Sequence, residues 1–225
     1  RRYRRRFREP VRTSLGEWKV REGFIVRAEY EDGLVGFGEV APVPWFGTET
    51  MEQAEEFLSR MSMDHSLNEA PPELPCCSFA VSSCSSVLRQ DFDAPSGEAA
   101  VVGLLPCGQA ALHAMIKLSA KGFRVFKWKV GVLDFEEERE IYESLKQSLP
   151  ESGRLRMDAN GGWDVMEAWR WLELLQGDEL VEFVEDPLDP RLWEASFGLC
   201  EAFDTPLALD MPMTAKGAPR ILDKG

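Results

Sequence analysis

The sequence predicts a mixed α/β protein in which an α+β domain precedes part of a parallel (β/α) barrel. Residues 1–45 alternate apolar and charged side chains with the period of two that is typical of half-buried strands. From residue 99 onward, short apolar runs alternate with helical segments, the order expected of a parallel sheet. The predicted domains are therefore 1–98 and 99–225, and the second holds five strands of a barrel type that usually has about eight.

The first element is a basic segment, RRYRRRFR, at residues 1–8. It fits an edge strand that alternates Tyr3, Arg5 and Phe7, and the alternatives are a nucleic-acid-binding arm or the remnant of a targeting peptide. A formal net charge of −13 argues against nucleic-acid binding, because a phosphate-binding surface needs clustered positive charge. We therefore expect an edge strand and no nucleic-acid partner.

A hairpin and two helices complete the first domain. A strand around residues 24–29 is followed by the turn signal Glu31-Asp32-Gly33 and a return strand over 34–40. Gly36 and Gly38 in the return strand predict a close approach of another backbone. Thr48 is the expected N-cap of a helix over 50–60, and a second helix is expected over 78–88.

The second domain reads as alternating strands and helices. Gly122 and Gly177 each follow a helical segment and fit C-terminal caps, and Pro150 stops another helix. The expected strands are 100–105, 123–130, 155–159, 180–184 and 207–209. The expected helices are 109–120, 135–149, 165–175 and 192–203.

Composition limits the environment and the partners. The chain is 44% hydrophobic and 29% charged, an ordinary globular mixture, and it has no run of 18 apolar residues that could span a membrane. Its five cysteines are an odd number without a repeated CxxC pair, so neither a zinc site nor a disulfide framework is expected. Reduced thiols indicate the cytoplasm, or the plastid stroma in a photosynthetic eukaryote.

Three carboxylates follow three successive predicted strands. They are Asp158 in LRMDAN, Glu185 in VEFVEDPL and Asp210 in PLALD, each separated from the next by one strand-helix unit. The carboxyl ends of parallel barrel strands meet at one face, so these groups should converge there and repel one another unless a cation neutralises them. Oxygen ligands favour a hard ion, and we expect Mg²⁺. The alternative is that each acid caps the helix that follows it.

A pair of lysines precedes this set on one strand, in FKWKVG. Lys127 and Lys129 are two residues apart, so both should point to the barrel interior while Trp128 points away. A second cation and a metal ion nearby would lower the pKa of such a lysine, which could then act as a base near neutral pH. The alternative is an exposed edge strand with two surface lysines.

Together these groups predict one type of chemistry. A metal ion binds a substrate carboxylate, a lysine removes the proton from the adjacent carbon, and the metal stabilises the negative charge that develops. The substrate is therefore a small carboxylate.

The chain resembles the enolase superfamily, in its muconate-lactonizing-like subgroup, and most closely the o-succinylbenzoate synthases of the cyanobacterial type. The similarity is spread over roughly residues 3–210 and is most specific in VGFGEVAPVPWFGTET and FKWKVGV. It implies an α+β capping domain and a modified (β/α)7β barrel. It also implies a Mg²⁺-dependent lyase that dehydrates 2-succinyl-6-hydroxy-2,4-cyclohexadiene-1-carboxylate to 2-succinylbenzoate in menaquinone or phylloquinone biosynthesis.

The resemblance also assigns roles to residues. Lys129 would be the acid/base, Lys127 would support it, and Asn160 would lie behind the ligands. The metal ligands would be Asp158, Glu185 and Asp210.

The chain departs from this pattern at its end. Met211 follows Asp210 where the family usually has an acid, and a further lysine would lie on a strand after residue 225. We therefore expect a C-terminally incomplete copy. The alternatives are a dipeptide epimerase or N-acylamino acid racemase of the same superfamily, or an inactive truncated remnant.

Overall fold

The computed structural model describes residues 1–63, 70–88 and 101–214. The chain divides into two compact units, the first formed by Arg1–Pro10 with Trp18–Glu98 and the second by Val11–Glu17 with Ala99–Gly225. Each unit has its own sheet and its own apolar core, and each is described by itself. The predicted domain boundary lies within 89–100, outside the described residues.

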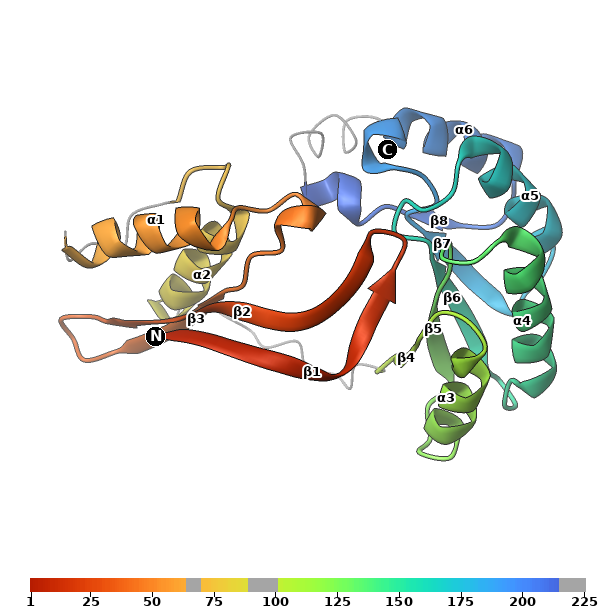
Figure 1. Cartoon of the computed structure of the whole chain (residues 1–225), viewed down its shortest axis with the longest axis horizontal. Coiled ribbons are helices and arrows are strands. Elements are labelled where there is room, and N and C mark those ends of the chain that lie inside the picture. The colour runs from red at the N-terminus through yellow and green to blue at the C-terminus, as the bar shows by residue number, and fades with distance from the viewer. Residues whose placement is uncertain (64–69, 89–100, 215–225) are drawn as a thin grey trace. The chain divides into compact units, whose positions relative to one another are not determined.

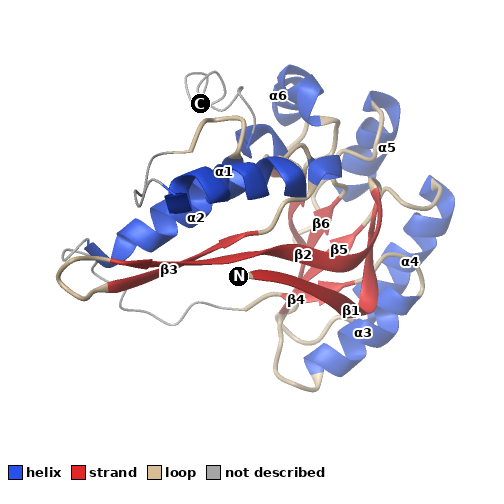
Figure 2. Cartoon of the chain, turned by 60° about the vertical axis from the view of Figure 1, so that its left-hand side comes forward, coloured by secondary structure: helices blue, strands red, loops and turns tan. Residues whose placement is uncertain are grey.

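The first unit is built on a three-stranded sheet in the order β1-β2-β3, drawn in red in Figure 2. Strand β1 is an edge strand, as the sequence predicted, and its arginines are exposed while Tyr3 and Phe7 are half-buried. Strands β2 and β3 pair antiparallel from Phe24↔Val40 to Glu29↔Val35, with the predicted turn between them. The strands are β1 (Arg2–Thr13), β2 (Gly16–Glu29) and β3 (Val35–Val40).

Two helices accompany this sheet, α1 (Met51–Met63) and α2 (Pro75–Ser85). The predicted N-cap of α1 is wrong by two residues. The Thr50 hydroxyl accepts from the Gln53 amide at 3.2 Å and the Gln53 side chain accepts from the Thr50 amide at 2.8 Å, a reciprocal capping box. Thr48 instead accepts a hydrogen bond from the Val43 amide at 2.7 Å and closes the preceding loop.

Helix α2 packs closely against β3 at the two predicted glycines. A Cβ atom on Gly36 would lie 2.1 Å from the carbonyl oxygen of Cys84, and one on Gly38 would lie 2.2 Å from that of Ala80. Any side chain at these positions would therefore push helix and strand apart. Both glycines serve close backbone approach, as the sequence predicted.

The second unit contains a five-stranded parallel sheet in the order β4-β5-β6-β7-β8. Figure 1 shows helices α3 to α6 on one side of this sheet. The strands are β4 (Gly103–Leu105), β5 (Val125–Lys129), β6 (Arg154–Asp158), β7 (Val181–Glu185) and β8 (Leu207–Ala208). The helices are α3 (Ala110–Ser119), α4 (Phe135–Ser148), α5 (Val165–Leu175) and α6 (Trp193–Ala202).

The core of the second unit lies between sheet and helices. Phe126, Trp128, Leu155 and Met157 alternate along β5 and β6 and are fully buried in it, whereas the residues between them are half-buried on the other face. Alternation along a strand thus sends apolar side chains to the helices and leaves the opposite face for polar groups. None of the described helices is long and apolar enough to cross a membrane.

Candidate functional site

Polar side chains gather where β5, β6 and β7 end. The parallel register places Lys129 beside Asp158, and Asp158 beside Glu185. The three residues therefore stand side by side at the carboxyl edge of the sheet, as expected from their spacing in the sequence. The alternative of helix-capping acids does not describe Asp158 or Glu185, since the α5 N-cap is Asp164 and Asp189 caps the short turn before α6.

The two lysines hold these carboxylates directly. Lys127 Nζ lies 2.8 Å from Asp158 Oδ2 and 2.7 Å from Glu185 Oε1, and Lys129 Nζ lies 2.6 Å from Asp158 Oδ2. The side chains are 26% exposed for Lys127, 14% for Lys129 and 1% for Asp158. Strand β5 lies between β4 and β6, and Trp128 is buried on its other face, so the alternative of an exposed edge strand is wrong.

The pKa of Lys127 depends on its burial and on the two carboxylates that it contacts. Burial lowers the pKa of this ammonium group, but hydrogen bonds from it to Asp158 and Glu185 outweigh burial and raise the pKa above its usual value. Both carboxylates face Lys127 and stabilise its charged form.

Asn160 is buried and bridges the two kinds of side chain. Its Oδ1 accepts from Lys129 Nζ at 2.9 Å, and its backbone amide donates to Asp158 Oδ1 at 3.1 Å. A positive φ of 46° turns the chain back after β6, and the Ser14 hydroxyl donates to the Asn160 carbonyl oxygen at 2.9 Å. The predicted place of Asn160 behind a ligand thus coincides with a hydrogen bond that orients Lys129.

Among the described residues, three carboxylates form a group that could hold a metal ion. Asp158, Glu185 and Asp186 each offer one oxygen, and these oxygens all lie within 4.8 Å of one another. An all-oxygen set of this size fits Mg²⁺, which takes few protein carboxylates and completes its shell with water and substrate. Asp186 was not among the predicted ligands, although this residue directly follows Glu185 in the EDPL segment.

Asp210 lies beside this group but its carboxylate is not part of it. Asp210 follows β8 closely and is exposed, and its backbone amide donates to Asp186 Oδ1 at 2.9 Å. Asp186 is 1% exposed, and burial raises the pKa of its carboxyl group to about 6. Asp210, the third predicted ligand, is therefore connected to the carboxylate group by its backbone amide and not by its side chain.

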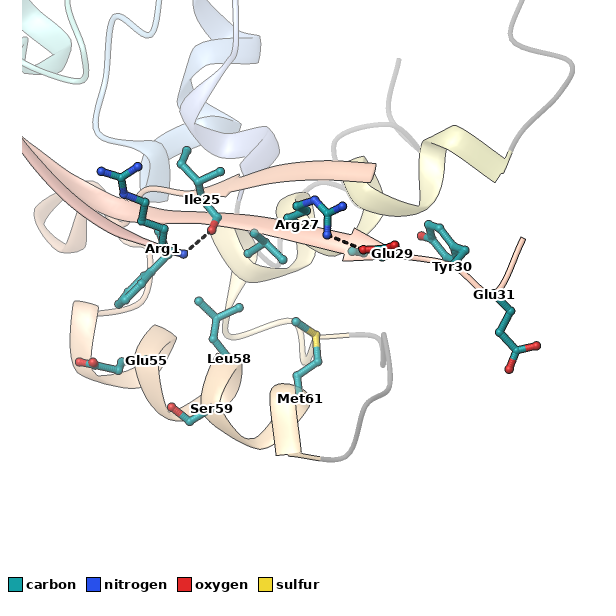
Figure 3. A pocket seen from close by; sticks show the side chains of 13 residues that line it. Arg1, Ile25, Arg27, Glu29, Tyr30, Glu31, Glu55, Leu58, Ser59 and Met61 are labelled. Atoms are coloured by element: carbon teal, nitrogen blue, oxygen red, sulfur yellow. Dashed lines mark hydrogen bonds and ion pairs between the residues drawn. The ribbon is translucent and has the colours of Figure 1, made fainter. Parts of the chain in front are cut away.

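The first unit carries a separate groove of about 900 Å³ between β2 and α1 (Figure 3). Its charged groups pair locally, with Arg27 Nη1 2.7 Å from Glu29 Oε2 and the amino group of Arg1 donating to the Ile25 carbonyl oxygen at 2.6 Å. Leu58 and Met61 from α1 line the opposite wall. The described carboxylates that line this groove are all exposed, so the catalytic candidate is the set at the strand ends.

Comparison with known proteins gives the family. A family model described as "MenC, N-terminal domain" matches residues 2–88, and one described as "Enolase C-terminal domain-like" matches residues 110–220. An o-succinylbenzoate synthase from Thermosynechococcus vestitus is 37% identical over 99% of this chain and 71% of its own length. The chain belongs to the o-succinylbenzoate synthase family. One from Edwardsiella ictaluri is 30% identical over 91% of this chain, which spans 63% of that relative.

A solved structure supports the same family. The o-succinylbenzoate synthase from Thermosynechococcus elongatus, determined with magnesium in its active site, matches with a TM-score of 0.81 and 34% identity over 100% of this chain and 72% of its own. An N-succinyl Arg/Lys racemase from Bacillus cereus matches with a TM-score of 0.82 at 20% identity over 99% of this chain and 68% of its own, which shows the shared fold alone.

Membership of the o-succinylbenzoate synthase family confirms the predicted fold class, a capping domain followed by part of an enolase-type barrel. It also supports the predicted function, the dehydration step of menaquinone biosynthesis, and the enzyme class, an enolase-superfamily lyase.

Proposed function

We propose that this chain carries the Mg²⁺-dependent dehydration of 2-succinyl-6-hydroxy-2,4-cyclohexadiene-1-carboxylate to 2-succinylbenzoate. The observation that carries the proposal is the contact of Lys129 Nζ with Asp158 Oδ2 at 2.6 Å, at the edge where the carboxylate group lies. A general base and a metal-binding set within one hydrogen bond of each other suit removal of a proton next to a carboxylate.

The proposed ligands of the metal ion are Asp158, Glu185 and Asp210. When bound, Mg²⁺ supplies positive charge that stabilises the negative charge developing on the substrate carboxylate. Asp158 and Glu185 already face one another through Lys127, and Asp210 stands at the end of the neighbouring strand β8. Three carboxylates leave coordination positions for water and substrate.

The lysines of β5 perform the proton transfers in this proposal. Lys129 takes the proton from the ring carbon that bears the carboxylate, and it then assists the departure of the ring hydroxyl, so that one proton and one hydroxide leave as water. Lys127 supports Lys129 electrostatically and faces the substrate carboxylate. Asn160 keeps the Lys129 side chain in place through its 2.9 Å hydrogen bond.

The predicted binding partner and the predicted cellular compartment remain proposals. The partner is a small carboxylate, without nucleic acid or membrane. The compartment, cytoplasm or plastid stroma, rests on the cysteine count, and all five cysteines are free thiols in the structure.

Incubation of the protein with the cyclohexadiene substrate and Mg²⁺ tests the proposal, with 2-succinylbenzoate detected by chromatography. Formation of the aromatic product that stops when Mg²⁺ is chelated supports it. A parallel panel of dipeptides and N-acylamino acids separates dehydration from epimerase or racemase activity. A full-length protein that forms no 2-succinylbenzoate contradicts the proposal, and a thermal melt by circular dichroism shows whether an inactive chain is folded.

A further inference from the structure

Asp186 lies where three strand ends come together. Its backbone amide donates to the Ala208 carbonyl oxygen at 2.9 Å, and its own carbonyl oxygen accepts from the Gly161 amide at 2.8 Å. Asp186 has a positive φ of 45°, a conformation that Asp and Asn adopt more readily than other residues with a Cβ atom. The residue thereby connects the loop after β6, the end of β7 and the end of β8.

The Asp186 side chain makes a second connection to the same segment. Oδ1 accepts from the Asp210 amide at 2.9 Å and from the Met211 amide at 3.2 Å, and Oδ2 lies 3.1 Å from the Met211 amide. The residue is 1% exposed, so these hydrogen bonds do not compete with bulk water. Both carboxylate oxygens thus face the backbone that carries Asp210.

We propose that Asp186 is a positioning residue that fixes the backbone of Asp210 and so sets where this ligand points. This inference rests on the proposed function, in which Asp210 is the third ligand of the metal ion. The competing role is that Asp186 is itself the third ligand, because its oxygen lies within 4.8 Å of those of Asp158 and Glu185. Groups that orient a ligand by hydrogen bonding typically contribute strongly to metal affinity.

Two features favour positioning. The Asp186 carboxylate already accepts backbone hydrogen bonds through both oxygens. In contrast, no described residue donates a hydrogen bond to the carboxylate of Asp210. Met211, directly after Asp210, carries a soft thioether, which is a poor ligand for a hard cation. Asp210 therefore carries the ligand role at this strand end, and its orientation depends on Asp186.

Binding of Mn²⁺ to the full-length protein, followed by electron paramagnetic resonance, separates the two roles without measuring activity. We compare Asp186→Asn, Asp186→Ala and Asp210→Asn. The carboxamide of Asp186→Asn keeps an acceptor oxygen and tolerates the positive φ, so this variant should bind Mn²⁺ more tightly than Asp186→Ala. Asp186→Ala should weaken binding by about ten- to a hundredfold, the usual effect of losing a group that orients a ligand. Asp210→Asn removes the charge of the ligand itself and should weaken binding at least as much.

Asp164 provides a matched control. Its carboxylate also accepts a backbone hydrogen bond, from the Glu167 amide at 2.8 Å at the start of α5. It makes no hydrogen bond to Asp158, Glu185 or Asp210 among the described residues. Asp164→Ala should lower the melting temperature and leave Mn²⁺ affinity unchanged. Thermal melts of all variants separate loss of folding from loss of metal binding.

The possible results are distinct. Equal weakening by Asp186→Asn and Asp186→Ala, with normal binding by Asp210→Asn, would show that Asp186 is the ligand and overturn the inference. If Asp186→Ala does not fold, the two Asn variants decide: loss of Mn²⁺ binding in Asp186→Asn with normal binding in Asp210→Asn overturns the inference. Wild-type affinity in a folded Asp186→Ala variant also overturns it. If the wild-type protein binds no Mn²⁺, there is no metal site, and both the inference and the proposed function are wrong.

Discussion

Both units of the chain bring cations and carboxylates together on a sheet, but they do so in different surroundings. In the first unit, Arg21 Nη2 lies 2.8 Å from Glu39 Oε2, and the two side chains are 37% and 38% exposed. In the second unit, Lys129 contacts an Asp158 side chain that is only 1% exposed. Water screens the first pair, whereas the second pair has lost most of its solvation.

The two pairs differ in burial and not in the presence of an ion pair. An exposed pair returns to water on separation at little cost. Removing one partner of a buried pair leaves an uncompensated charge and costs much more. Four predictions test this contrast, and the first concerns the substitution that should cost most.

Removal of the Lys129 ammonium group should have the largest effect. Lys129→Met should lower kcat for 2-succinylbenzoate formation by about a hundred- to ten-thousandfold, the usual contribution of a general base. The initial rate of product formation measures it. Lys121→Met, at an exposed lysine in the same unit, is the control and should keep the wild-type rate. Wild-type kcat in a folded Lys129→Met variant would show that another group acts as the base.

Removal of the buried negative charge should destabilise the second unit. Asp158→Asn leaves two lysine side chains without their shared carboxylate, and we expect a loss of about 3 kcal/mol in the free energy of unfolding. Urea denaturation followed by circular dichroism measures this loss. Asp204→Asn changes the same group at an exposed position and should have little effect. Equal stability of the two variants would contradict the contrast between buried and exposed charges.

The first unit should depend more on close backbone packing than on its ion pair. Gly38→Ala places a Cβ atom 2.2 Å from the Ala80 carbonyl oxygen and should destabilise the unit by about 1–3 kcal/mol. Gly198→Ala in α6 meets no atom within 4 Å and should instead stabilise the chain by about 0.5–1 kcal/mol. Thermal melts compare the two variants. A Gly38→Ala protein as stable as the wild type would mean that α2 moves away without cost.

Loss of the exposed pair should have the smallest effect. Arg21→Met should cost about 1 kcal/mol or less near neutral pH, since the pair is partly screened by water. A hydrogen bond from Arg21, and a second from Tyr3, lower the pKa of Glu39. The contribution of the pair is therefore present above the ordinary glutamate pKa and disappears as pH falls through the lowered one. Urea denaturation at several pH values should show the two proteins converging in acid.

Local sequence patterns determined most of the architecture. The expected helix over 165–175 coincides with α5, because a helix period of apolar residues follows a capping Asp164. The five parallel strands were predicted for the same reason, since short apolar runs between helical segments have few other arrangements. Parallel strands end at one edge, so the convergence of Lys129, Asp158 and Glu185 also followed from spacing alone.

Long-range packing determines which atoms meet at that edge. The sequence could not show that Asp186 turns back and binds the amides after β8, because this contact depends on a positive φ and on the register of two neighbouring strands. It also could not show that two carboxylates face Lys127 and raise its pKa. Periodicity is a property of neighbouring residues, whereas hydrogen bonds and pKa values depend on groups that only the folded chain brings within a few ångströms.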